Sequence, residues 1–257
     1  MKHRRKRVFF IHFSGGFCMR ILVTNDDGIG AEGLRRLAET AKCFGEVWVV
    51  APANQCSAMS QCVTIRKSLT VRPEEFPVDG VKAYSVSGTP ADCVDVALGY
   101  LMKEQRPDWC FSGMNRGFNA GYDIAYSGTV GAAMQALMLG VPAIAFSNQM
   151  GDVYEVADHY MAEIAEELLK KEKMIREIWN VNFPGCSLAD CKGVEWDVAI
   201  ESIPYYYGEY PTEPGTDGSV LLLDRNVYHE DHGDRHTDVA ALLRNKVAVG
   251  KIRSMVL

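Results

Sequence analysis

Short apolar runs alternate with amphipathic segments along most of this chain. Four runs contain few polar residues, as expected for strands covered on both faces of a sheet: residues 21–24, 47–50, 109–111 and 143–146. Apolar residues at helical spacing predict helices over residues 34–41, 130–137 and 157–169, and Gly140 is a suitable residue to end the second of these. A turn at residues 87–92 predicts the start of another helix, from Ala91 to Met102.

This order of elements predicts an α/β protein. Strands that alternate with helices form βαβ units, which give a parallel sheet with right-handed crossovers. The expected architecture is a Rossmann-like three-layer sandwich with a mostly parallel sheet, in which ligands bind beyond the carboxyl ends of the strands. The residues from 19 to 195 are assigned to this α/β catalytic core.

The C-terminal part of the chain, residues 196–257, has a different texture. From about residue 200 it is rich in turn residues, tyrosines and charge, which predicts an extended hairpin or arm followed by a returning strand. The YYYGEY run at residues 205–210 favours an oligomer contact, because aromatic residues are enriched at the centres of interfaces. The histidines 229, 232 and 236 lie among acids, which is typical of solvated side chains.

Residues 1–18 differ from the rest of the chain. They carry five Lys or Arg residues and no acid, followed by a short apolar run, which is similar to a signal peptide. That run is interrupted by His12, Ser14 and two glycines, and no A-x-A cleavage signal follows it. Because Met19 stands directly before the first predicted strand, we interpret these residues as an extension from a mis-assigned start.

Charge and cysteine usage narrow the classes of partner. A formal net charge of -6 argues against binding of nucleic acid polymers or anionic membranes, and no apolar run is long enough to cross a membrane. The eight cysteines form no C-x-x-C pair and no dense framework, which favours reduced thiols in a cytoplasmic protein. An acidic protein can still bind a phosphate ester if it first recruits a cation.

The first predicted strand ends in two adjacent acids, Asp26 and Asp27, within the segment ILVTNDDGIGAEG. One of them can cap the helix that follows. Two neighbouring carboxylates also repel each other and need a compensating charge. A hard cation such as Mg²⁺ or Mn²⁺ supplies that charge and prefers oxygen ligands.

The same segment contains a G-x-G-x-x-G pattern at Gly28, Gly30 and Gly33, after a strand and at the start of a helix. This pattern is typical of dinucleotide binding and leaves an NAD-dependent oxidoreductase as an alternative. Two observations argue against it. The acids directly before the first glycine would repel a pyrophosphate, and the second strand ends in APAN without an acid for the ribose.

Two further polar loops follow predicted strands, at residues 51–64 and 112–140. Their polar side chains are those of Asn54, Ser57, Ser60, Asn115, Asn119, Ser127 and Thr129. Glycine-rich loops and helix N-termini favour phosphate, although each loop by itself is also consistent with an ordinary turn capped by Ser127 or Thr129. Because all three loops follow strands, we expect them to face one crevice.

Several segments together resemble the survival protein E (SurE) family of 5′-nucleotidases. They are MRILVTNDDGIGAEG, VVAPANQCSAMSQCVT, SGTPADCV, PDWCFSGMNRGFNAGYDIAYSGTVGAAM and WNVNFP, which extend from Met19 to about Pro184. A weaker similarity continues through TDVAALLRNKVAVGKI, which resembles the late strand of the family. The resemblance implies an enzyme that removes phosphate from nucleoside 5′- and 3′-monophosphates and sometimes acts on short polyphosphate.

The resemblance also implies a site and an assembly. One divalent metal ion, Mg²⁺ or Mn²⁺, would be held by Asp26, Asp27, Ser57 and Asn115. Phosphate would be bound by Asn119, Ser127, Gly128 and Thr129. The chain would form a homodimer or homotetramer through its arm. This chain departs from the family pattern at Cys56, where a basic residue is usual, and at Phe118, where proline is usual.

The expected reaction is in-line attack of a water molecule on phosphorus, with Asp26 and Asp27 as the catalytic pair. Either aspartate can accept the proton. The sequence between residues 13 and 158 contains no histidine that could serve as a base. Two more functional classes stay open: a haloacid-dehalogenase-like phosphatase, whose D-x-D motif differs in spacing from N-D-D-G, and a non-catalytic nucleotide sensor.

Overall fold

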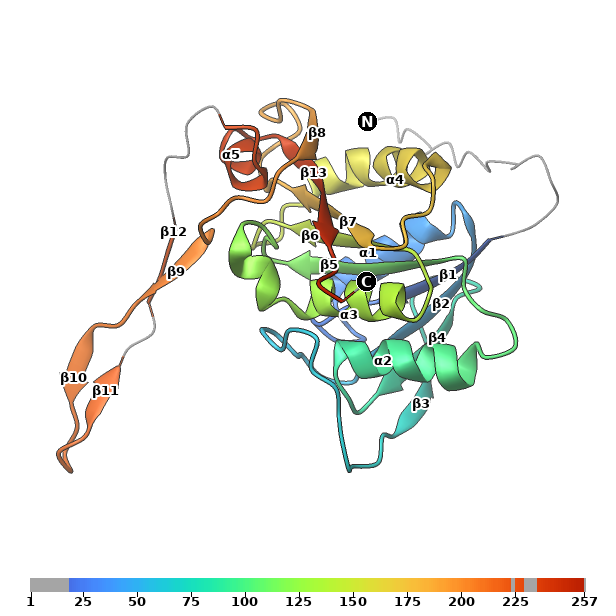
Figure 1. The fold of residues 1–257 in the computed structure, drawn as a ribbon, viewed down its shortest axis with the longest axis horizontal. Coiled ribbons are helices and arrows are strands. Elements are labelled where there is room, and N and C mark those ends of the chain that lie inside the picture. Colours follow the sequence, from blue (N-terminus) through green and yellow to red (C-terminus); the bar gives the residue numbers. More distant parts are fainter. Residues whose placement is uncertain (1–18, 223–224, 229–234, 257) are drawn as a thin grey trace, which may run out of the picture.

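The protein is built on one nine-stranded sheet, seen edge-on in the computed structural model (Figure 1). Residues 19–222, 225–228 and 235–256 are described. The strand order is β3-β4-β2-β1-β5-β6-β7-β13-β8. The bounds are β1 (Met19–Thr24), β2 (Gly45–Pro52), β3 (Val71–Glu74), β4 (Lys82–Val86), β5 (Trp109–Arg116), β6 (Ala143–Asn148), β7 (Glu177–Phe183), β8 (Val194–Val198) and β13 (Val247–Arg253).

The centre of the sheet is parallel. The strands β4, β2, β1, β5, β6 and β7 pair in parallel, whereas β3 and β13 run antiparallel to their neighbours β4 and β7. From β1 the chain builds outward to β2 and β4 on one side, and then crosses to β5, β6 and β7 on the other. The order therefore reverses between β1 and β5, where an α/β sheet opens a crevice at the carboxyl ends of its strands.

Helices cover both faces of the sheet, as the predicted three-layer sandwich requires. One face carries α1 (Glu32–Ala41) and α4 (Glu155–Lys170), and the other carries α2 (Pro90–Val96) and α3 (Gly128–Met138) (Figure 1). Strand β1 divides its side chains between the two layers, because Ile21 and Val23 join the first core and Leu22 joins the second. This explains why the strands read as continuous apolar runs.

The predicted helices are confirmed, with small differences at their ends. The turn at residues 87–92 caps α2 through Thr89, whose side chain accepts a hydrogen bond from the backbone N–H of Asp92. Helix α2 ends at Val96 and continues as a π-helix, η1 (Ala97–Leu101), which the periodicity does not distinguish from an α-helix. Gly140, with φ +82°, follows the end of α3.

The predicted arm is a pair of antiparallel ribbons that extends away from the core (Figure 1). Strand β9 (Tyr206–Glu209) pairs with β12 (Arg225–Tyr228), and β10 (Thr212–Pro214) pairs with β11 (Val220–Leu222). The chain then returns through α5 (Asp238–Leu243) and enters the sheet as β13. The segment that resembles the late strand of the family thus forms a helix first and a strand second. The division of the chain at residue 195 stays a prediction.

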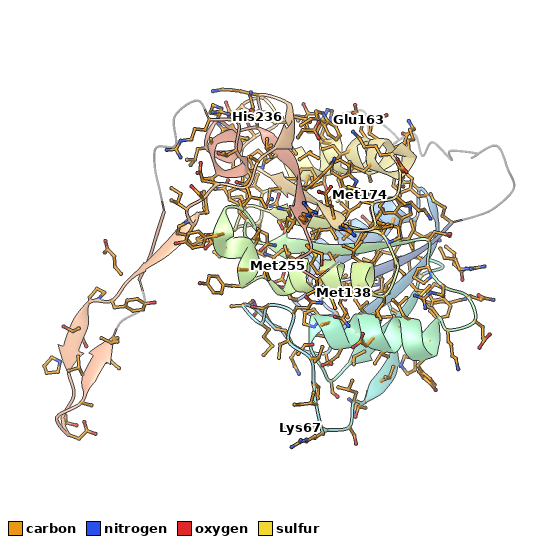
Figure 2. All side chains as sticks on the ribbon, in the orientation of Figure 1. Lys67, Met138, Glu163, Met174, His236 and Met255 are labelled. Atoms are coloured by element: carbon orange, nitrogen blue, oxygen red, sulfur yellow. The ribbon has the colours of Figure 1, made fainter. Side chains whose placement is uncertain are left out.

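The last described residues cross the outside of α3. Met138 and Met255 line the same open cleft there (Figure 2). None of the helices within the described ranges is both long and apolar enough to cross a membrane. The predicted N-terminal extension, residues 1–18, and the histidines 229 and 232 lie outside the described residues.

Candidate functional site

The three polar loops predicted from the sequence meet at the carboxyl ends of β1, β2 and β5. The backbone N–H of Cys56 donates to the carbonyl oxygen of Asp26 at 2.7 Å, and that of Ile29 donates to Pro52 at 2.9 Å. These bonds place the loop after β2 against the end of β1. Ser57, the next residue of this loop, is exposed, and its hydroxyl accepts a hydrogen bond from Gln55 at 2.9 Å.

Asp26 is the most enclosed acid of this region, with only 3% of its surface exposed. The hydroxyl of Thr129 donates to its Oδ1 at 2.5 Å. Burial, and next to it repulsion from Asp27, raise the pKa of Asp26 to about 6 against the opposing effect of the Thr129 bond. Gly128 allows this contact, because a Cβ atom at that position would lie 2.9 Å from Oδ2 of Asp26.

Asp27 is half-buried and faces β5. Its Oδ2 accepts a hydrogen bond from the backbone N–H of Arg116 at 3.0 Å, which brings the neighbouring residue Asn115 to the same edge. Burial raises the pKa of Asp27, although the Arg116 N–H and guanidinium oppose that rise. The guanidinium of Arg116 lies 3.7 Å from Asp152 and forms an ion pair with it at the surface.

A bulge in β5 positions Asn115. The register between β5 and β6 shifts between Ser112 and Asn115, where Gly113 has φ +128°. A side chain at Gly113 is excluded, because its Cβ would lie 2.1 Å from the carbonyl oxygen of Phe146. Asn115 Nδ2 donates to the carbonyl of Gly117 at 2.9 Å, and its Oδ1 accepts no hydrogen bond from any described residue.

Asn119 lies in a buried polar network that the sequence pattern did not predict. Its Nδ2 donates to Ser147 at 2.7 Å, and its backbone N–H donates to Asn182 Oδ1 at 2.9 Å. Its carbonyl oxygen accepts from Asn180 at 2.8 Å and from Asn182 at 3.0 Å. The sequence feature that could have predicted these partners is the pair Asn180 and Asn182, two polar residues in alternate positions of an otherwise apolar strand.

The segment from Ser127 to Thr129 forms the start of α3. Ser127 is the N-cap, and its hydroxyl accepts a hydrogen bond from the backbone N–H of Val130 at 3.0 Å. The backbone N–H groups of Gly128 and Thr129 belong to the first turn, which has no partners within the helix. The helix dipole adds partial positive charge there, so this end of α3 favours an anion. Asp26 lies beside it.

The fold and this edge together define an α/β protein in which two acidic side chains lie beside a helix N-terminus suited to phosphate. Comparison with known proteins agrees with this class and identifies the family. The family described as "Survival protein SurE" matches residues 21–202. The chain belongs to this family.

Relatives with curated names agree over most of the chain. A "5′-nucleotidase SurE" of Alkaliphilus metalliredigens is 42% identical over 236 residues, which cover 91% of this chain and 92% of the relative. Proteins of the same name from Clostridium botulinum (strain 657) and Brevibacillus brevis are 43% and 40% identical, covering 89% and 76% of this chain and 90% and 77% of the relatives. The crystal structure of a SurE protein from Aquifex aeolicus superimposes with a TM-score of 0.79 at 29% identity, covering 93% of this chain and 94% of that one.

Proposed function

We propose that this chain is a 5′-nucleotidase that uses one divalent metal ion, Mg²⁺ or Mn²⁺, to hydrolyse nucleoside monophosphates to nucleoside and phosphate. Membership in the family makes it a phosphoric monoester hydrolase. The observation that carries the metal dependence is the pair Asp26 and Asp27. Burial raises the pKa of both carboxyl groups, so their ionised forms need a nearby positive charge.

The residues at this edge fit a hard cation. Two carboxylates, the Oδ1 of Asn115 and the hydroxyl of Ser57 are the oxygen donors that Mg²⁺ and Mn²⁺ prefer. Among the described residues, no three His, Cys, Asp or Glu side chains are grouped so that they could hold a metal ion. The proposed site therefore combines two acids with neutral oxygens, and it leaves room for phosphate oxygens in the remaining positions.

The side chains of this chain would bind phosphate and handle the proton. When bound, the cation polarises a phosphoryl oxygen and lowers the pKa of a coordinated water molecule. The N–H groups of Gly128 and Thr129 would hold further phosphoryl oxygens, next to the N-cap Ser127. Asn119 belongs to the same assignment, and its Nδ2 donates to Ser147 in this structure. A water molecule would add to phosphorus as the bond to the ribose oxygen breaks, so that the water loses one proton and the departing ribose oxygen gains one. Asp27, which is less enclosed than Asp26, is better placed to pass a proton to solvent.

The finer assignments belong to the same proposal. The proposal includes activity on 3′-nucleotides and short polyphosphate. The residues assigned to the site bind the phosphate and the cation, and none of them is assigned to the sugar or the base. Assembly as a homodimer or homotetramer through the arm is supported by Val220, Leu221 and Leu222, which are more than half exposed there. A reducing, cytoplasmic location is supported by the free thiols of the seven described cysteines.

The decisive experiment is a phosphate-release assay on the full chain. We expect AMP and GMP to be hydrolysed in the presence of Mn²⁺ or Mg²⁺, and excess chelator to abolish phosphate release because the cation is then removed from the paired acids. Restoring the cation should restore activity. Phosphate release that is unaffected by chelator would overturn the metal assignment. Nucleotide binding without phosphate release would favour the sensor, and tight binding of NAD without metal would favour the oxidoreductase.

A second prediction separates the two roles of Ser127. Ser127→Ala should cost about 1 kcal/mol in the free energy of unfolding, because the cap of α3 is lost. It should also raise KM for AMP several-fold, since the same turn is assigned to phosphate. Thr89→Ala, which removes the N-cap of α2, is the matched control, with a similar loss of stability and an unchanged KM. Equal KM values for the two variants would leave Ser127 with a capping role only.

A further inference from the structure

One peptide group connects the proposed metal site to the root of the arm. The carbonyl oxygen of Gly117 accepts the hydrogen bond from Asn115 Nδ2 at 2.9 Å. The N–H of the same peptide group, which belongs to Phe118, donates to the phenol oxygen of Tyr206 at 3.1 Å. Tyr206 is the first residue of β9, so the arm contacts one side of a peptide whose other side contacts Asn115.

The orientation of the Asn115 amide determines which of its two end atoms is available to a cation. An asparagine side chain has a donating end and an accepting end, and only the oxygen can bind a cation. Because Nδ2 is engaged by Gly117, Oδ1 is the end left for the metal. A turn of the amide by half a rotation would present N–H groups instead. Donation by the peptide N–H to Tyr206 also makes the Gly117 carbonyl a stronger acceptor.

We propose that Tyr206 is a positioning residue for the metal site: its phenol holds the Gly117–Phe118 peptide, and that peptide fixes the amide of Asn115 with Oδ1 towards the cation. This inference rests on the proposed function, because Asn115 matters here as a metal ligand. It extends that function by making metal affinity depend on the root of the arm.

Further contacts hold Tyr206 and Phe118 in position. The carboxylate of Asp123 accepts the backbone N–H groups of Tyr205 and Tyr206 at 2.7 and 2.8 Å. The ring of Tyr205 packs edge-on against Phe118, with ring centroids 5.1 Å apart. Gly117 has φ +132°, and a Cβ there would lie 3.5 Å from the Tyr206 oxygen, which is ordinary van der Waals contact, so the phenol packs directly against this peptide.

The hydrogen bond between Phe118 and Tyr206 also suggests a role for the residue at position 118, where this chain departs from the family pattern. Phe118 stands where the pattern of the family that the sequence resembles has proline. Proline has no N–H and cannot donate to a phenol. The hydrogen bond to Tyr206 therefore depends on the residue that this chain carries at position 118.

The test is direct titration of Mn²⁺ into the full chain without nucleotide, followed by electron paramagnetic resonance of the free ion. Tyr206→Phe removes the phenol oxygen and keeps the ring. We expect its Kd for Mn²⁺ to rise about five-fold, which corresponds to the loss of about one hydrogen bond. The value of kcat at saturating Mn²⁺ should stay within about two-fold of the wild type, because the ligands themselves remain. Tyr210→Phe, on an exposed part of the arm, is the matched control and should bind Mn²⁺ as the wild type does.

Asn115→Ala separates failure of this inference from failure of the proposed function. We expect this variant to bind Mn²⁺ at least ten-fold more weakly. If Asn115→Ala weakens binding while Tyr206→Phe leaves the Kd unchanged, the positioning role of Tyr206 is wrong and the metal site stands. If Asn115→Ala also binds Mn²⁺ normally, the metal site itself is wrong. A fall in kcat for Tyr206→Phe that saturating Mn²⁺ does not restore would also overturn the inference.

Discussion

Asp26→Asn is expected to abolish activity and, at the same time, to stabilise the metal-free protein. Activity should fall at least about a thousand-fold, because the variant loses a ligand charge next to the phosphate site. The free energy of unfolding in excess chelator at pH 8 should rise by as much as about 3 kcal/mol. The reason is that the wild-type carboxylate is ionised at this pH in a site that exposes only 3% of it.

The pH dependence of this stability follows from the direction of the shift. The pKa of Asp26 is about 6 in the folded protein and 3.8 in the unfolded chain, so the folded protein binds the proton more tightly. The contribution of Asp26 to the free energy of unfolding is therefore fully present below about pH 4, and it is lost as the pH rises through 6. Denaturant unfolding of the metal-free wild type between pH 4 and 8 should show this loss, and Asp26→Asn should lack it.

Two controls make the result specific. Asp152→Asn removes the same charge from a side chain that is 88% exposed, and should change neither stability nor activity. Saturating Mn²⁺ should stabilise the wild type and leave Asp26→Asn unchanged, because a cation bound only by the folded state adds to its stability. If Asp26→Asn is less stable than the wild type without metal at pH 8, the carboxylate is compensated within the protein, and the argument for a cation fails.

Gly33→Ala is expected to destabilise the protein by about 3 kcal/mol or more, although alanine is the better helix former by about 1 kcal/mol. Gly33 lies in the first turn of α1 against β5, and a Cβ there would come within 2.0 Å of the carbonyl oxygen of Met114. That atom is backbone and cannot move aside without displacing Asn115, so activity should fall as well. Denaturant unfolding and the AMP assay measure the two effects.

Gly30→Ala is the matched change within the same G-x-G-x-x-G pattern. A Cβ at Gly30 meets no atom within 4 Å, so we expect stability to change by less than about 0.5 kcal/mol and activity to be retained. A dinucleotide-binding loop would behave differently, because its second glycine allows the backbone to approach the pyrophosphate. Loss of nucleotide binding in Gly30→Ala with normal stability would support the dinucleotide interpretation.

The three glycines illustrate how one sequence pattern can arise from different causes. Gly28 has φ +98°, which favours glycine in the turn after Asp27. Gly30 is exposed, and Gly33 is a packing residue. The letters of the pattern were in the sequence, but the atoms near Gly28 belong to β2 and the loop after it, and those near Gly33 belong to β5, which are distant in the chain. Only the folded structure could assign the separate roles.

Much of the core was predictable because it depends on local patterns. Four of the parallel strands, β1, β2, β5 and β6, and the helices α1 to α4 follow from apolar runs and helical spacing, whereas β4 and β7 were not predicted. The remaining strands were harder to predict. Strand β3, at the edge of the sheet, has mostly exposed side chains and shows little apolar signal. Strand β13 pairs with β7 and β8 only because the chain returns after the arm, and sequence periodicity contains no information about such pairing.

The sequence by itself determined the α/β class, the strand ends that carry the polar loops, and the pairing of Asp26 with Asp27. These features depend on neighbours in the chain. The tertiary structure decided which backbone groups hold those acids, how Asn119 is fixed by β6 and β7, and that Tyr206 reaches the peptide beside Asn115. Such contacts join residues far apart in the sequence, and hydrogen-bond geometry between them exists only after the strands have paired.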